Sequence, residues 1–415
     1  MSSLAKVEER RLKYVATIND DALGEETEPD YELQYVDIGN VDSSGNIHEI
    51  VTYRFEDAPS RARRRVRDGD VIISTVRTYL QAIAPVQAPP DNLIVSTGFA
   101  VVRPNPNECD PGFCKYALRE PGFLAEVEKR SVGVSYPAIN ASELGDIPIY
   151  LPPIRQQRLI ASYLDRETRR LDALVASKAL VLGLLAEKRR ALITHALTRG
   201  LDARAPLRDS GVPWLDKIPG HWEIERAKWL FRERDERSET GDEELLTVSH
   251  LTGVTPRSEK DVNMFEAETT EGYKICFAGD LVINTLWAWM GAMGVSPVNG
   301  IVSPAYNVYQ PGPRLEPNFV DALVRMPIFA QEVTRYSKGV WSSRLRLYPE
   351  GFFETFLPVP SLDEQRRIVA YIAKEAGRLD ALSAANERTI KVLKERRSAI
   401  ISAAVTGQIA VESAA

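Results

Sequence analysis

Two copies of one long element decide the fold of this chain: LPPIRQQRLIASYLDRETRRLDALVASKALVLGLLAEKRRALITHALTRGL (151–201) and VPSLDEQRRIVAYIAKEAGRLDALSAANERTIKVLKERRSAIISAAVTGQI (359–409). They align without a gap at a shift of 208 residues, so that the sequence RLDAL at 170–174 returns at 378–382. A duplication of this length fixes the architecture, because each copy must be one structural unit.

Each copy is typical of a long helix. Prolines stand only at the start of each copy, where a helix tolerates them, and none follows. Apolar residues then recur at steps of four and three, which is the pattern of a coiled-coil seam. The predicted seam contains Ile160, Leu164, Leu171, Leu174, Val181, Leu185 and Leu192 in the first copy and Ile368, Ile372, Leu379, Leu382, Leu393 and Ile400 in the second.

Two globular segments alternate with these helices. In the second segment, AGDLVINTLWAWM from residue 278 resembles DGDVIISTVRTYL from residue 68, and SKGVWSSRLR from residue 337 resembles SVGVSYPAIN from residue 131. Identities are sparse, so the globules are expected to share an α+β fold while their surface residues differ. The predicted division is 1–150, 151–205, 206–357 (a linker and the second globule) and 358–415. Within the first globule, a helical stretch is expected around 113–129.

The order globule, helix, globule, helix favours antiparallel pairing of the two helices. A parallel pair would require the second globule to span the whole length of a helix, roughly 65 Å for about 44 residues. Antiparallel pairing instead lets each globule join the nearest helix ends, which predicts a pseudo-twofold arrangement.

Composition excludes several classes of protein. No run of eighteen apolar residues exists that could span a membrane, and the charged N-terminal sequence lacks the apolar core of a signal peptide. Three cysteines make neither a disulfide framework nor a four-ligand zinc set, and we expect a cytoplasmic protein. The net charge of −6 argues mildly against nucleic-acid binding, although binding depends on local patches and not on the average.

The motifs of an enzyme are missing. No glycine-rich loop with a lysine for phosphates is present. Asp110-Pro111-Gly112-Phe113 resembles a methyltransferase motif only faintly, and we interpret it as a plain turn. The four histidines, His48, His195, His221 and His250, lack the spacing of metal ligands. That the chain is an enzyme is therefore the weakest of the hypotheses.

Three segments together resemble one family: LPPIRQQRLIASYLDRETRRLDAL (151–174), SGVPWLDKIPGHWEIERAKWLF (210–231) and LPVPSLDEQRRIVAYI (357–372). They resemble the DNA-specificity subunit of type I restriction-modification systems, and the resemblance covers nearly the whole chain. It implies two target-recognition domains, each reading one half of a bipartite double-stranded DNA site, separated by two conserved helical regions that form an antiparallel coiled coil. It also implies two modification (methyltransferase) subunits and restriction (endonuclease/translocase) subunits as partners. The specificity subunit itself would be non-catalytic, with S-adenosylmethionine and ATP bound only by partner subunits.

Candidate DNA contacts fall in matching parts of the two globules. Arginine, hydroxyl and aromatic side chains suit phosphates, base edges and base faces. In the first globule they are Arg61, Arg63, Arg64, Arg65, Arg67, Arg77, Tyr79, Ser131 and Tyr136. In the second they are Trp287, Lys338, Trp341, Ser342 and Arg344.

Other interpretations stay open at this point. The arginine run can equally be a solvated charged hairpin, and the tryptophans can belong to the core of the second globule. For the whole chain, the alternative is a coiled-coil scaffold whose globules bind proteins in place of DNA, and such a scaffold would show no salt-dependent affinity for duplex.

Overall fold

The computed structural model describes residues 8–259, 269–339 and 345–411, and it divides the chain into two compact units. Unit 1 is Met1–Leu180 with Glu387–Ala415, and unit 2 is Val181–Asn386. The predicted long helices are present as α4 (Ile154–Arg199) and α9 (Leu362–Val405). Each unit combines one globule with half of each helix, so the compact units cut both helices, whereas the division predicted from the sequence keeps each helix whole.

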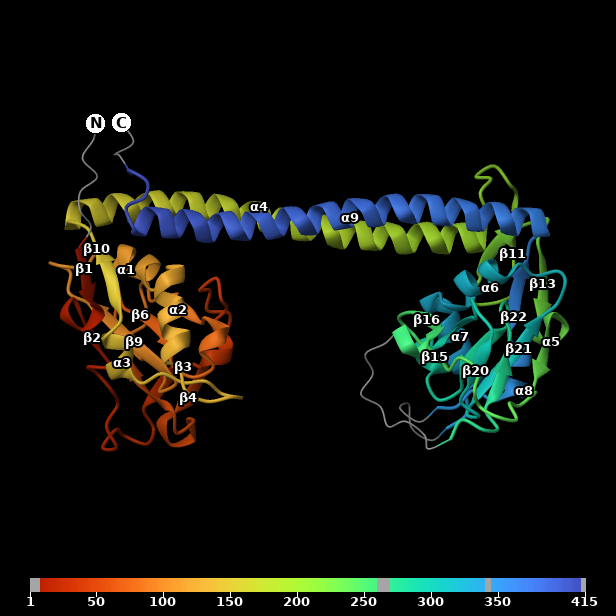
Figure 1. Cartoon of the computed structure of the whole chain (residues 1–415), viewed down its shortest axis with the longest axis horizontal. Helices are drawn as coiled ribbons and strands as arrows, with labels where there is room; N and C mark the ends of the chain where they lie inside the picture. Colours follow the sequence, from red (N-terminus) through yellow and green to blue (C-terminus); the bar gives the residue numbers. More distant parts are fainter. Residues whose placement is uncertain (1–7, 260–268, 340–344, 412–415) are drawn as a thin grey trace. The chain divides into compact units, whose positions relative to one another are not determined.

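The globule of unit 1 is built on two four-stranded sheets (Figure 1). One sheet is antiparallel, and the other contains the parallel pair β3–β8. The first sheet runs β2 (Ala16–Ile18), β9 (Phe99–Pro104), β6 (Val71–Ser74), β7 (Ile83–Pro85), and the second runs β4 (Val51–Arg54), β3 (Glu32–Val36), β8 (Leu93–Ser96), β5 (Ala62–Arg65).

Two short helices replace the single helix expected around 113–129. They are α1 (Pro111–Ala117) and α2 (Pro121–Arg130), and each begins with a proline after an acidic cap, Asp110 or Glu120. Proline at 121 cannot donate the hydrogen bond that a continuing helix requires, so the chain must start a new helix there. Asp110 accepts a hydrogen bond from the Phe113 amide, so this segment is a helix start and not the plain turn expected from the sequence.

Unit 2 repeats the antiparallel sheet in the same order. It runs β14 (Phe231–Arg234), β21 (Tyr306–Pro311), β18 (Leu281–Asn284), β19 (Met293–Val295), and the strand pairs β15 (Leu246–Ser249) with β16 (Gly253–Pro256) and β17 (Lys274–Cys276) with β20 (Gly300–Val302) accompany it. Its helices are α5 (Ala227–Leu230), α6 (Pro317–Val324), α7 (Pro327–Tyr336) and α8 (Pro349–Phe353), and the linker contributes β11 (Leu207–Asp209) and β12 (Lys217–Pro219).

Each globule joins its helices through one antiparallel strand pair. In unit 1, β1 (Glu8–Arg11) pairs with β10 (Pro148–Leu151), and α3 (Ala141–Gly145) precedes β10. In unit 2, β13 (Glu223–Arg226) pairs with β22 (Phe356–Val359) in the same register. The chain therefore enters and leaves each globule on neighbouring strands.

A buried glutamine fixes the start of each long helix. The Gln157 amide nitrogen donates to the carbonyl oxygens of Pro152 and Glu108, both at 2.8 Å, and its oxygen accepts from the Asp110 amide at 2.7 Å. Gln365 repeats all three bonds in unit 2, with Pro360 (2.9 Å), Arg314 (2.8 Å) and Glu316 (2.8 Å). Burial makes an unpaired amide costly, so these bonds give a physical reason for the repeated glutamine.

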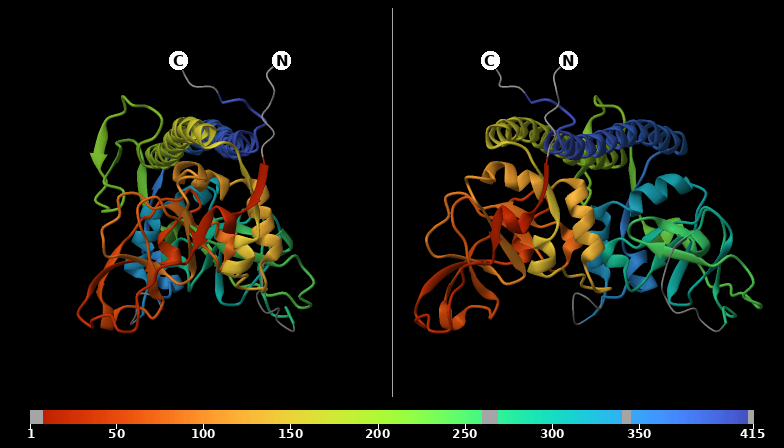
Figure 2. Two further views of the ribbon diagram at one scale, coloured as in Figure 1. Left: turned by 90° about the vertical axis from the view of Figure 1, so that its left-hand side faces the viewer. Right: turned by 60° about the vertical axis from the view of Figure 1, so that its left-hand side comes forward.

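Within each unit the two helix halves run antiparallel. In unit 1, Asp172 of α4 pairs with Arg397 of α9 at 2.9 Å, and in unit 2, Arg189 of α4 pairs with Asp380 of α9 at 2.9 Å. The shift of 208 residues exchanges one pair for the other, as two equivalent antiparallel helices require. In unit 1 these halves pack on α1 and α2 through one shared core (Figure 2).

The predicted seam is wrong at one matched position in each helix. Leu174 and Leu382 are 42% and 53% exposed, although the pattern of fours and threes places both in the seam. After the buried Leu171, the partly buried line continues by a step of four to Val175. An α-helix has 3.6 residues per turn, so its buried face drifts away from a strict repeat of 3.5.

Candidate nucleic-acid interface

In unit 1 a turn and a loop that are far apart in the sequence lie together. The turn, 75–81, follows β6, and the loop, 131–138, follows α2. The Arg77 amide donates to the Pro137 carbonyl oxygen at 2.8 Å, and the Ile139 amide donates to that of Thr75 at 2.9 Å. The Arg77 guanidinium lies 4.9 Å from the centre of the Tyr136 ring. We call this turn and loop the unit 1 platform; it joins two side chains that the sequence singled out separately.

The platform exposes aromatic side chains on a constrained backbone. Tyr79 and Tyr136 are 58% and 61% exposed. Arg77 has a positive φ of 55°, which a non-glycine residue adopts only when its surroundings hold it there. Exposed rings and a guanidinium on a fixed backbone suit base stacking and phosphate contact.

Ser131, one of the predicted DNA contacts, is hydrogen-bonded within the platform. Its hydroxyl donates to the Val127 carbonyl oxygen at 2.7 Å and lies 2.9 Å from the Thr78 hydroxyl. These bonds tie the loop to α2 and to the turn, so Ser131 anchors the platform.

Unit 2 carries the matching platform, formed by 285–291 and by the described parts of 337–346. The Leu347 amide donates to the Thr285 carbonyl oxygen at 3.0 Å, as Ile139 does to Thr75 in unit 1. Trp287 is 51% exposed and stacks on Trp289, with ring centres 6.4 Å apart. Trp287 is therefore at the surface, and the core interpretation is wrong for it.

The loop of the unit 2 platform contains the remaining predicted contacts. Lys338 and Arg346 exchange two backbone hydrogen bonds of 2.9 Å, and the Arg346 side chain donates to the Thr285 hydroxyl at 3.3 Å. Trp341, Ser342 and Arg344 lie outside the described residues. Sequence reasoning missed Arg346, although the alternation SRLRLY placed it two residues after Arg344.

The two platforms share a scaffold and differ in chemistry. The bond from Ser74 to Ala82 corresponds to the bond from Asn284 to Ala292, so Arg77 of unit 1 takes the place of Trp287 of unit 2. Their loops also differ in length. In unit 1, Val132 and Ala138 exchange two backbone hydrogen bonds, and five residues, 133–137, lie between them. In unit 2, seven residues, 339–345, lie between the corresponding pair, Lys338 and Arg346.

The arginine run occupies an edge strand and is largely engaged within the protein. The run begins just before β5 and ends just after it, and β5 pairs with β8 from a distant part of the chain, so the predicted hairpin is wrong. Arg61, Arg65 and Arg67 are nevertheless exposed to solvent. Arg63 stacks 4.6 Å from the Phe55 ring centre, and burial lowers the pKa of Arg64. Asp21 lies 2.6 Å from Arg67 and 4.0 Å from Arg65. Arg61 is exposed, and its carbonyl oxygen accepts from the Thr97 amide.

A buried ion pair stabilises the strand that carries each turn. Asp70, before β6, is 1% exposed and binds Arg103 at 2.8 Å; the hydrogen bonds that Arg103 donates to Asp70 raise the pKa of Arg103. Asp280, before β18, is 3% exposed and binds Arg234 at 2.9 Å. The two aspartates are equivalent, but their arginines come from different strands, β9 and β14, so the partner could not be identified by aligning the two globules.

Features of other site classes are not found in the described part of the chain. No group of three His, Cys, Asp or Glu side chains there could hold a metal ion. None of its helices has both the length and the apolar character needed to cross a bilayer. All three cysteines are buried, and burial raises the pKa of the Cys276 thiol to about 12.

The chain thus carries two equivalent platforms, one on each globule, with different side chains on matching scaffolds. Residues 6–179 match the family described as "Type I restriction modification DNA specificity domain". This part of the chain, the first globule with the first half of α4, therefore carries a domain of that description.

Two curated relatives and two solved structures are similar to this chain. A putative MjaX specificity subunit of Methanocaldococcus jannaschii is 24% identical over 39% of this chain, and the EcoBI specificity subunit of Escherichia coli is 21% identical over 70%. The matches span 37% and 65% of those relatives' own lengths. A chain solved in work on assembly and conformational transition of the type I R-M system has a TM-score of 0.78 at 24% identity, covering 98% of this chain and 99% of that chain. The HsdS subunit of Thermoanaerobacter tengcongensis has a TM-score of 0.58 at 24% identity, covering 98% of both chains. At this identity the structural likeness establishes the fold.

Proposed function

We propose that the chain is the non-catalytic DNA-recognition subunit of a type I restriction-modification complex. Each globule reads one half of a bipartite double-stranded site. The observation that carries this proposal is the pair of platforms, which place different side chains on equivalent scaffolds. Two different half-sites require that combination, because base readout depends on side-chain chemistry while positioning depends on the frame.

The contacts divide by chemistry. Arg77, Lys338 and Arg346 supply cations for phosphates or guanine edges, and Tyr79, Tyr136 and Trp287 supply flat exposed rings. The engaged arginines of β5 contribute mainly to the fold of unit 1, with Arg61 at the start of the run left facing solvent.

The long helices dock the partner subunits in this proposal. In unit 1, Leu174, Leu180 and Val392 are 42%, 67% and 59% exposed, and in unit 2, Leu184 and Leu382 are 56% and 53% exposed. Exposed leucines on helices that already have a partner indicate a further protein surface. Two modification subunits and the restriction subunits are the proposed partners. S-adenosylmethionine and ATP bind those partners, and the assembly is cytoplasmic.

The test is to co-express the chain with its neighbouring modification subunit and to map methylated bases in genomic DNA. We expect methylation at one bipartite motif. A well-formed complex without such a motif would contradict DNA recognition and would favour a protein-binding scaffold.

A further inference from the structure

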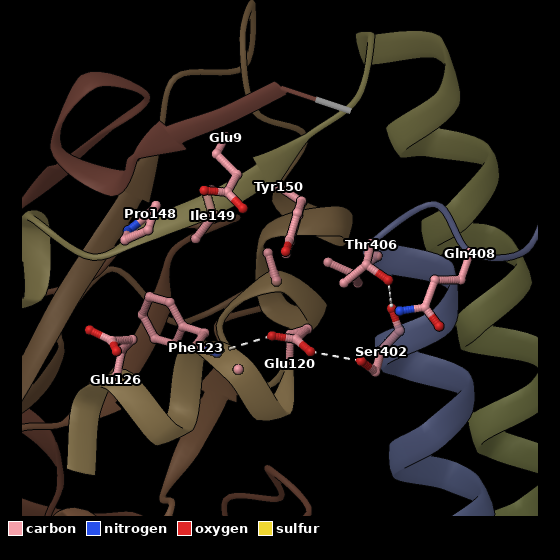
Figure 3. Close-up of a pocket in the computed structure, with 13 residues that line it drawn as sticks. Glu9, Glu120, Phe123, Glu126, Pro148, Ile149, Tyr150, Ser402, Thr406 and Gln408 are labelled. Carbon is pink, nitrogen blue, oxygen red and sulfur yellow. Dashed lines mark hydrogen bonds between the residues drawn. The ribbon is translucent and has the colours of Figure 1, made fainter. Parts of the chain in front are cut away.

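Unit 1 contains a cavity of about 320 Å³ where its globule meets the end of α9 (Figure 3). The walls are β1 with β10, the start of α2 and the last turns of α9. Figure 3 shows Glu9 and Tyr150 on the strands, Glu120 and Phe123 at the start of α2, Ser402 on α9 and Thr406 just after α9. Neither platform includes this cavity, and DNA recognition as proposed above does not use it.

The cavity has an apolar floor and an acidic rim. Ala117, Phe123, Ile149 and Val405 form the floor, and all four are buried. The rim carries three carboxylates, those of Glu9, Glu120 and Glu126. Lys129 and Arg130 already pair with Glu126, at 3.1 and 3.0 Å, which leaves Glu9 and Glu120 for an occupant.

Hydrogen bonds fix part of the rim. Glu120 accepts from the Ser402 hydroxyl at 2.7 Å and from the Phe123 amide at 3.0 Å. A hydrogen bond with Glu9 raises the pKa of Tyr150, because losing the phenolic proton would place two negative charges together. The rim is therefore preorganised, with its negative charge held beside the apolar floor.

Unit 2 shows what fills the same place. Of the four floor residues, Ile149 and Val405 match Leu357 and Leu197 by the shift of 208 residues. Ala117 and Phe123 match Leu323 and Phe329 by a shift of 206, which aligns the proline starts of α1 with α6 and of α2 with α7. There the chain's own linker covers the floor. Trp214 is 6% exposed and meets Phe329 edge to face, with ring centres 5.3 Å apart. Val212, Leu215 and Ile218 are buried in the same core. Among the described residues of unit 1, none takes the place of this linker segment.

The walls of the unit 1 cavity are more polar than those of the equivalent site in unit 2. Glu9, Glu120 and Tyr150 in unit 1 correspond to Ile224, Met326 and Pro358 in unit 2. In unit 2 the occupant is apolar, and the corresponding wall residues are apolar. An occupant of the unit 1 cavity must therefore bring both an apolar group for Phe123 and a cation for the carboxylates.

We propose that this cavity docks a segment of a partner protein, with an aromatic side chain against Phe123 and a lysine or arginine beside Glu9 and Glu120. The aromatic anchor is inferred from Trp214 in the equivalent site, and the cation is inferred from the acidic rim. A buried aromatic anchor with a charged neighbour is a common basis of protein docking. In unit 2 the chain's own linker occupies the equivalent site.

The test uses the full chain and the synthetic peptide acetyl-GVPWLKK-amide, which copies 211–215 and adds two lysines. The indole carries fluorine, so that fluorine NMR reports only the peptide. We expect saturable binding and at least a tenfold loss when the peptide's tryptophan is alanine, about what a central aromatic anchor contributes. Glu9→Lys should weaken binding by about tenfold through loss of one close ion pair.

Glu8→Lys is the matched control. Glu8 is the exposed neighbour of Glu9 on β1, and alternation along a strand points its side chain away from the cavity, so binding should not change. Three outcomes would overturn the proposal: no saturable binding, binding that Glu9→Lys leaves unchanged, or binding that appears only after residues 1–7 or 412–415 are removed. The last outcome would show that an end of this chain occupies the cavity.

Discussion

Unit 1 and unit 2 agree where polar groups are buried and differ where side chains face solvent. Gln157 and Gln365 make the same three hydrogen bonds, and the buried Asp70 and Asp280 each bind an arginine. By contrast, Arg77 and Trp287 occupy one exposed position with unlike chemistry. Burial imposes a fixed set of partners, whereas the surface of a platform has no such requirement, so one frame can carry two different binding surfaces.

The largest expected effect comes from exchanging a whole globule. Replacing 212–356 with the matching segment of a relative should change one half of the recognised site and leave the other intact. Each mismatched base pair costs about 1–3 kcal/mol, so a half-site of three bases corresponds to a discrimination of at least about a hundredfold. Mapping methylated bases in cells that express the exchanged protein checks this result. A change in both halves would show that the two platforms do not read separately.

Replacing each buried glutamine tests whether the helix start that it holds is equally important for the stability of the two units. Gln365→Ala removes the partner of one buried amide and two buried carbonyl groups, and we expect a loss of about 3 kcal/mol in the free energy of unfolding. Gln157→Ala should lose a similar amount in unit 1. Urea unfolding followed by tryptophan fluorescence suits unit 2, and hydrogen exchange resolves both units. Gln87→Ala, at an exposed position, is the control; equal losses in all three variants would refute the role assigned to the buried bonds.

Single changes on the platforms should act on one half-site only. Tyr136→Ala removes the ring that lies beside the Arg77 guanidinium, and we expect binding to weaken by about 1–3 kcal/mol, the usual loss of one base-stacking ring. Trp287→Ala should cost a similar amount in unit 2. Affinities for duplexes that vary one half-site at a time separate the two effects. If Tyr136→Ala altered discrimination at the half-site of unit 2, independent readout would be wrong.

The helix pairs should give the smallest effect. Arg397 and Arg189 bind aspartates that are 47% and 58% exposed, and ion pairs near solvent contribute about 0.2–1 kcal/mol. A double-mutant cycle with Arg397→Ala and Asp172→Ala should give a coupling energy in this range, and the cycle at Arg189 and Asp380 should match it. A coupling above about 2 kcal/mol in one unit alone would show that the two halves of the coiled coil are not equivalent.

The sequence predicted the repeated parts of the molecule well. The duplication and its apolar period indicated two long paired helices, and the repeated Gly-Asp motif located the strand before each turn. These features depend on local pattern, which a sequence displays directly. The antiparallel direction followed from the order of segments along the chain.

What the sequence missed depends on contacts between distant segments. The arginine run looked like a free charged surface, because neither Phe55 nor Asp21 is marked in the sequence as its partner. Leu174 fits the apolar period and is nevertheless exposed, because the buried face of a helix drifts over several turns. Arg346 was overlooked because only the fold shows that it bonds to Thr285.

The strand pair that joins each globule to the long helices also bears on how recombination can exchange one globule for another. β1 pairs with β10, and β13 pairs with β22, so the two points where the chain enters and leaves a globule are neighbours in one short ladder. Genetic recombination with both breakpoints in that ladder would deliver a complete globule as a cassette. The backbone bonds of the ladder do not depend on which side chains it carries, so a foreign cassette needs to match the helices only in the core that globule and helices share. New specificity can then arise in a single exchange, with no series of intermediate proteins between the old site and the new one.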